Sequence, residues 1–269
     1  MADNGKFEAP QFIKPFHLAT LAHKMRLEKL SQLTLPEEVA TYANTMKLWE
    51  ALGVPPIKPI HRQASSRYHP IEVLRDQSTV ESTADALVKL LASVCSNERT
   101  LDAVNTMLRE LVDNCYSHAG VSDGIYGFIC AQIWRRASKA QIAIADTGIG
   151  IRASLALNEE LGDRLKSENC CELATEYGVT GKPGKGHSGY GLAVAKALIE
   201  QSKGTLIVMS GKEGFCLRDG VHSIFTTPQA WNGILLIIEW NIDVPMDIGN
   251  VYKSFPLPNG MNDDDFFNF

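Results

Sequence analysis

Apolar residues recur at steps of three and four along much of this chain, which is the spacing of amphipathic helices. The pattern predicts five helices, at residues 18–30, 37–49, 84–94, 101–118 and 191–200. The helix expected after Pro36 begins with two glutamates, which favour the positive end of a helix dipole. Each of these segments needs an apolar surface to pack against.

Short apolar runs between turn residues provide that surface. They predict four buried strands, at residues 125–134, 141–145, 205–209 and 233–240. Short turns between neighbouring strands indicate a mixed, mostly antiparallel sheet with helices on one face. The expected fold class is therefore α/β, a two-layer sandwich, with a small helical N-terminal extension.

Gly53 and a cluster of prolines up to Pro59 interrupt the pattern and indicate a boundary. The expected division is a helical N-terminal module at 1–60, a linker at 61–77, the main domain at 78–245 and a tail at 246–269. Residues 12–21 faintly resemble the start of STAS-like modules, and a plain helical packing extension is the favoured alternative.

The composition of the chain limits the kinds of function that the protein can have. The chain has 269 residues, of which 45% are hydrophobic, enough for one large domain with appendages or two small ones. A net charge of −5 disfavours nucleic acid as the main partner. No apolar run approaches a membrane span, and no signal peptide is seen. Six cysteines without a C-x-x-C pair indicate reduced thiols rather than a zinc site, so a cytoplasmic location is expected.

The stretch Gly-Lys-Gly-His-Ser-Gly-Tyr-Gly-Leu at 184–192 places four glycines within eight positions, directly before a predicted helix. Glycine lets the backbone approach a ligand closely. The N–H groups at the start of a helix attract anions. This pattern predicts a phosphate-binding loop, with an ordinary structural turn as the alternative.

Upstream, Glu110 and Asn114 lie one turn apart on the same face of a predicted helix. A carboxylate beside a carboxamide suits magnesium chemistry, because the amide oxygen is a hard ligand and the carboxylate can hold or deprotonate a water. The alternative is an incidental polar pair on a solvated face.

Between these two motifs, Asp146 ends a predicted buried strand and is followed by Gly148 and Gly150. A carboxylate at a strand end can accept a hydrogen bond from an exocyclic amine such as that of adenine, and the glycines leave room for the ring. An ordinary Asp-Thr-Gly turn is the alternative.

The three motifs occur in the order E-x-x-x-N, D-x-G-x-G, G-x-G-x-x-G-x-G-L. In this order and spacing, residues 78–240 resemble the GHKL superfamily, the ATPase fold shared by DNA gyrase, Hsp90, histidine kinases and MutL. The resemblance implies ATP and Mg²⁺ as ligands and the same α/β sandwich for a domain at 78–245.

By that resemblance, Asn114 would bind the Mg²⁺ ion and Glu110 would be the general base in members that hydrolyse ATP. Asp146 would recognise the adenine amine, with Gly148 and Gly150 shaping its pocket. The lid over the phosphates would comprise Gly184, Gly186, Gly189, Tyr190, Gly191 and Leu192.

Several residues in or near the predicted lid have two possible interpretations. Lys182 and Lys185 either add positive charge to the lid or are simply solvated. His187 and Ser188 either touch phosphate or make a local turn contact. Ile234 stands where many family members carry a threonine that reaches the adenine region, and Thr226 or Thr227 could substitute for it.

Two function classes follow. The first is an ATP-hydrolysing or phosphotransferring enzyme, an ATPase or protein kinase, in cytosolic signalling or regulation. The second is a non-hydrolysing, ATP-dependent switch that recruits a partner protein.

The tail, Asn262 to Phe269, is acidic and aromatic; it is either a disordered end or a docking motif for a protein partner or for self-association.

Overall fold

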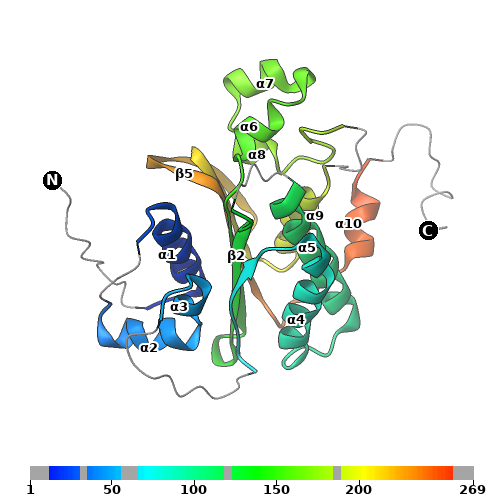
Figure 1. The fold of residues 1–269 in the computed structure, drawn as a ribbon. Helices are drawn as coiled ribbons and strands as arrows, with labels where there is room; N and C mark the ends of the chain where they lie inside the picture. The colour runs from blue at the N-terminus through cyan, green and yellow to red at the C-terminus, as the bar shows by residue number, and fades with distance from the viewer. Residues whose placement is uncertain (1–11, 31–34, 56–65, 118–122, 184–188, 257–269) are drawn as a thin grey trace.

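The computed structural model describes residues 12–30, 35–55, 66–117, 123–183 and 189–256 (Figure 1). Its centre is a five-stranded sheet in the order β1-β2-β3-β5-β4, in which all neighbouring strands are antiparallel. The strands are β1 (Tyr68–Leu74), β2 (Gly127–Trp134), β3 (Lys139–Asp146), β4 (Thr205–Arg218) and β5 (Val221–Asn241). The α/β fold class is confirmed.

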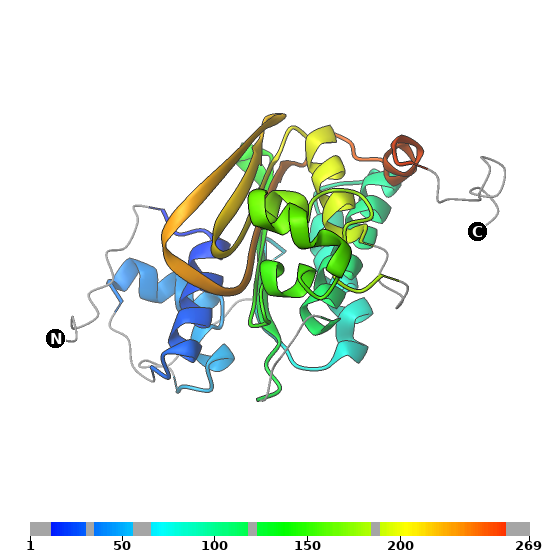
Figure 2. The ribbon, with the colours of Figure 1, turned by 90° about the horizontal axis from the view of Figure 1, so that it is seen from above.

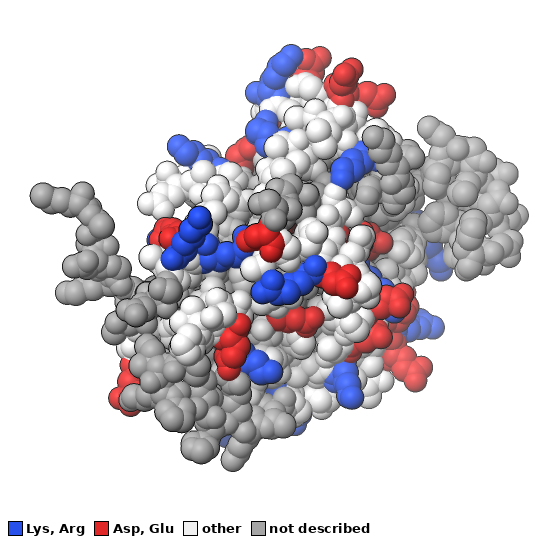
Figure 3. Space-filling model, viewed as in Figure 1, with Lys and Arg blue, Asp and Glu red and all other residues white. Residues whose placement is uncertain are grey.

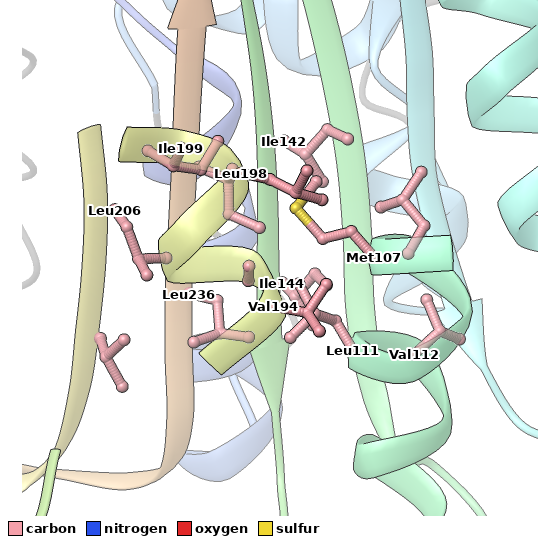
Figure 4. Packing of buried hydrophobic residues seen from close by; sticks show 14 of the residues in the cluster. Met107, Leu111, Val112, Ile142, Ile144, Val194, Leu198, Ile199, Leu206 and Leu236 are labelled. Carbon is pink, nitrogen blue, oxygen red and sulfur yellow. The ribbon is translucent and has the colours of Figure 1, made fainter. Parts of the chain in front are cut away.

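One face of the sheet is covered by the helices α4 (Val80–Ala92), α5 (Glu98–Ser117), α9 (Gly191–Gln201) and α10 (Ile248–Ser254). The short helices α6 (Ile151–Leu155), α7 (Gly162–Ser167) and α8 (Cys170–Leu173) lie between β3 and α9 in the sequence. Figure 4 shows Met107 and Leu111 of α5 facing Val194 of α9 and Ile144 of β3. These side chains are buried, so the apolar stripes of both helices form one core with the sheet.

The opposite face is covered by α1 (Pro15–Leu27), α2 (Glu37–Thr45) and α3 (Leu48–Ala51) (Figures 1 and 2). Leu18 and Met25 of α1 share a buried cluster with Phe128 of β2. Strands that are buried on both faces read as continuous apolar runs, which explains the sequence of β3. The helical N-terminal extension thus forms a third layer on the sheet, where the expectation was helices on one face.

Residues 68–74 fall within the expected linker but form the edge strand β1. The sequence obscures this strand because Pro70 interrupts it, and its pairing with β2 shifts register between His69 and Glu72. Proline is tolerated at such irregular edge positions. Ile71 enters the cluster on one face and Leu74 the cluster on the other, so this segment belongs to the core.

Strands β4 and β5 extend well beyond the predicted runs and form a long hairpin, the orange and yellow arm of Figure 2. Asp219 and Gly220 form its turn with positive φ angles of 50° and 78°, which match the right-handed twist of a tight hairpin. The outer half of β5 is largely exposed, so no buried apolar run marks it in the sequence, whereas Phe215 and Leu217 of β4 are buried.

Helix α10 lies within the expected tail and contacts α5 and α9. Asp247 begins this helix by accepting a hydrogen bond from the N–H of Asn250.

Residues 262–269 lie outside the described residues. Within the described ranges, no helix is both long and apolar enough to cross a bilayer. Acidic and basic side chains are interspersed on the face shown in Figure 3.

We expect Leu18→Ala to lower the free energy of unfolding by about 2–5 kcal/mol, because it leaves a cavity between α1 and the sheet. Urea unfolding followed by circular dichroism measures the loss. The control is Leu27→Ala, since Leu27 is 49% exposed and its truncation should cost little. A separate early transition confined to the N-terminal helices would contradict the shared core.

Candidate functional site

The three sequence motifs meet around one pocket at an end of the sheet. It is lined by Glu110 and Asn114 of α5, Asp146 of β3 and Gly191 of α9, among others. Gly189, Tyr190 and Leu192 of the predicted lid also line it, and the cavity measures about 180 Å³. Gly184, Lys185, Gly186, His187 and Ser188 lie outside the described residues.

Asp146 is the buried carboxylate of this pocket, with 6% of the residue exposed. Its Oδ1 accepts hydrogen bonds from the N–H of Gly148 at 2.7 Å and the N–H of Ile234 at 3.1 Å. Burial raises the pKa of Asp146 to about 7, and these two hydrogen bonds limit the rise. The carboxylate is therefore fixed in place yet able to titrate near neutral pH.

Gly233 makes the position of Asp146 possible. Its φ angle is +82°, and a Cβ atom here would come within 2.3 Å of the Asp146 carbonyl oxygen and 2.7 Å of Oδ1. Ile234, which replaces the expected threonine, supplies its backbone N–H to Asp146 and lines the pocket. Thr226 and Thr227 are not among the described lining residues.

Ser210 of β4 ties the turn after Asp146 to strand β5. Its hydroxyl accepts a hydrogen bond from the N–H of Ile151 at 2.9 Å and donates one to the carbonyl oxygen of Gly233 at 2.8 Å. Gly150 lies against the same hydroxyl, where a Cβ atom would come within 2.9 Å of it. Both glycines of this motif therefore belong to the turn, although neither Gly148 nor Gly150 is among the described pocket-lining residues.

The N-terminal layer reaches the back of this site through His23 of α1. This buried imidazole stacks on Trp231 with ring centroids 4.3 Å apart. Burial and the charge of Arg26 lower the pKa of His23 to about 4, while hydrogen bonding to the backbone at Asn232 and Asp146 opposes the shift. A neutral histidine thus supports the two chain segments that carry Asp146 and Gly233.

Helices α5 and α9 approach closely where Glu110 and Asn114 lie. A Cβ atom on Gly191 would be 3.0 Å from Asn114 Nδ2 and 3.4 Å from Glu110 Oε2. Glycine at 191 therefore brings the N–H groups at the start of α9 next to both side chains. Burial, followed by the charges of Glu110 and Asp102, raises the pKa of Tyr252, which places α10 beside the same carboxylate.

The base of the lid is anchored by aromatic contacts. Tyr190 stacks on Tyr177 with ring centroids 4.4 Å apart and an interplanar angle of 7°. Tyr177 in turn contacts Phe255, just beyond α10, with centroids 4.5 Å apart. The lid and the segment after α10 thus share one aromatic cluster.

Lys182 has a structural contact. Its Nζ donates a hydrogen bond to the carbonyl oxygen of Ser117, at the C-terminal end of α5. The last turn of α5 contains no basic residue of its own, so Lys182 supplies the cation that the helix dipole favours there. Lys182 is not among the described pocket-lining residues.

Sequence reasoning missed Ser210, Gly233 as a close-packing residue, and His23. Ser210 and His23 carry no motif, because their roles depend on contacts with residues far away in the chain. The close packing at Gly233 could have been predicted from the sequence, since an isolated glycine at the start of a buried strand indicates a close backbone approach.

Comparison with known families agrees with this geometry. The family model described as "Histidine kinase-, DNA gyrase B-, and HSP90-like ATPase" matches residues 100–229. This range carries α5, the turn after Asp146, and α9. The chain therefore contains a GHKL-type ATPase domain, as its sequence motifs predict, and this domain supports ATP binding. A search of curated proteins finds no match to the chain.

We expect Ser210→Ala to lower the free energy of unfolding by about 1–3 kcal/mol, because the N–H of Ile151 and the carbonyl of Gly233 lose a buried partner. It should also weaken ATP binding, since both groups hold the Asp146 turn. Urea unfolding and calorimetry measure the two effects. Ser223→Ala, at an exposed position of β5, is the control and should change neither. Equal effects of the two substitutions would refute this role of Ser210.

Proposed function

We propose that the protein binds ATP together with Mg²⁺ and hydrolyses it or transfers its terminal phosphoryl group, in a signalling or regulatory role. The observation that carries the proposal is the convergence of Glu110, Asn114, Asp146 and the start of α9 on one pocket. A nucleoside triphosphate needs a group that recognises its base, a ligand for its metal ion and N–H donors for its phosphates, and these residues can supply them.

The adenine end is assigned to Asp146. One of its oxygens is occupied by the N–H groups of Gly148 and Ile234, which leaves the other to accept a hydrogen bond from the exocyclic amine. Ile144 and Leu236 line the same pocket and offer apolar surface to the ring. Amine recognition by a buried, rigid carboxylate favours adenine over bases that lack this donor.

The phosphate end is assigned to the N-terminus of α9, whose N–H groups and dipole attract anions. The donor set beside it fits Mg²⁺, which prefers few protein oxygens and completes its shell with water and substrate phosphates. Asn114 would supply the protein oxygen. Bound there, Mg²⁺ would neutralise phosphate charge.

Glu110 is the proposed general base. It lies one helical turn from Asn114 on the same face, and a proton from an attacking water or hydroxyl would pass to its carboxylate. Gly191, at the start of α9, lies against Glu110. A nucleotide at the α9 terminus would therefore lie beside the base on α5.

The second candidate function is a switch with negligible turnover. It is favoured by the contacts that join the site to α10: Tyr190 of the lid stacks on Tyr177, which contacts Phe255. Nucleotide that orders the lid would bias the position of α10, and a partner protein could detect this difference.

Incubation with γ-labelled ATP distinguishes these functions. We expect Glu110→Gln to retain ATP affinity and to lose any phosphate release or transfer by at least about 100-fold, because a general base contributes about 10²–10⁴-fold. Glu98→Gln, in the first turn of the same helix, is the matched control and should leave turnover unchanged. Labelled phosphate or phosphoprotein supports catalysis; binding with neither product, in wild type and with cell extract added, supports the switch.

Asn114→Ala should remove the dependence of ATP affinity on Mg²⁺, measured by calorimetry with and without the metal. Asn105→Ala on the same helix is the control. The Asn105 side-chain amide donates a hydrogen bond to Asp85 of α4, and Asn105 is not among the described pocket-lining residues. Equal magnesium dependence in wild type and Asn114→Ala would refute the metal assignment.

The binding of ATP should weaken as the pH falls from 8 to 6. Burial raises the pKa of Asp146 to about 7, so below that pH the carboxyl gains a proton and loses its ability to accept from the adenine amine. Affinity should approach a tenfold loss per pH unit below the pKa. Asp146→Asn is the control for titration of the nucleotide itself: it should bind weakly and without this pH dependence. A parallel pH profile in both proteins would contradict the assignment.

A further inference from the structure

A second pocket, here called the basic pocket, lies where β2 ends and β3 begins, at the other end of β3 from Asp146. It measures about 650 Å³, within the range of about 300–1,000 Å³ typical of ligand sites. Among the described residues that line it, the acidic side chain is Glu239 and the basic ones are Lys14, Arg67, Arg135, Arg136 and Lys139.

The charge of the basic pocket is only partly balanced. Glu239 accepts a hydrogen bond from Lys14 Nζ at 2.7 Å, and Lys139 Nζ lies 3.7 Å from its other oxygen. Arg135 donates to Ser93 and Ser66, which are neutral. The lining therefore keeps a positive excess in a chain whose net charge is −5. Such a concentration of cations attracts a negatively charged guest.

Aromatic side chains line the same pocket. Phe12 and Trp134 lie with ring centroids 6.1 Å apart, and Lys14 Nζ lies 5.6 Å from the Trp134 ring. Phe12 is 58% exposed. The pocket thus offers cations and an aromatic surface to one guest.

The sequence contains a segment with the complementary chemistry. Residues 263–265 are three consecutive aspartates, and the next four positions contain three phenylalanines. Carboxylates pair with guanidinium groups in bidentate hydrogen bonds. The phenyl rings gain free energy when they leave water for an aromatic pocket. We propose that segment 263–269 of one copy docks in the basic pocket of a second copy.

A second copy is favoured by reach. Phe255 packs on Tyr177 beside the predicted lid, at the nucleotide end of the sheet. Seven residues lie between Phe255 and Asp263, and the eight steps of a fully extended chain between them span about 28 Å. The eight residues of β3 from Lys139 to Asp146 take about 23 Å along the sheet. Phe12 and Lys14 precede α1, which covers the face of the sheet opposite α10, so docking within one copy would need an almost fully extended chain.

Docking between copies can be reciprocal, so that two chains exchange their segments in a closed dimer. The association is independent of the nucleotide chemistry, because the basic pocket and the ATP pocket share no lining residue. Ion pairing makes it sensitive to salt.

Analytical ultracentrifugation of the full chain tests the proposal. Wild type should dimerise at low salt, and the dimer should weaken at least tenfold in Arg135→Glu/Arg136→Glu and in Asp263→Lys/Asp264→Lys. The control is Lys166→Glu/Lys212→Glu, which makes the same charge change at exposed positions that do not line the basic pocket and should leave dimerisation intact. Circular dichroism and ATP affinity confirm that each variant is folded.

Mixing the two reversed-charge variants gives the decisive result. The aspartates of the first fit the unchanged pocket of the second, and the lysines of the second fit the glutamates of the first. We therefore expect the mixture to dimerise although each variant alone does not. A wild type that stays monomeric to about 200 μM, a dimer insensitive to these substitutions, or a mixture that remains monomeric would each overturn the proposal.

Discussion

The arrangement of the candidate ATP pocket depends on one buried carboxylate. Asp146 lies at the end of β3 without a cationic partner among the described residues, and burial alone would disfavour its charge. Two backbone N–H groups compensate, one from its own turn and one from β5. Those N–H groups reach it because position 233 has no side chain. The geometry of β3, β5 and the following turn is therefore set together around this single group.

That constraint extends into both of the outer layers. Ser210 joins the turn after Asp146 to β5 from the strand on the far side. His23 brings α1 against the backbone at Asp146 and Asn232. On the opposite side, Tyr252 of α10 lies in the field of Glu110. Segments outside the matched family range thus lie against the turn that carries Asp146 and beside Glu110.

Much of the fold was predictable from local patterns. The helices containing Leu108 and Val194 and the buried strand containing Ile142 were placed within a few residues of their observed bounds, because each carries a strong apolar period. For the strand containing Ile237, only the C-terminal end was placed this closely. The failures have a common cause. Strand β1 contains Pro70, the outer half of β5 is exposed, and α10 buries only Val251, so none presents a strong period.

The sequence by itself determined the three motifs and hence the nucleotide chemistry, because their geometry is local. Glu110 and Asn114 share a helix face by spacing, Asp146 ends a strand, and the glycine run meets a helix start. The tertiary structure decided that the N-terminal helices form a third layer, that Lys182 caps α5, and that Ser210 and Gly233 build the carboxylate site. These depend on contacts between residues tens of positions apart, which no local period encodes.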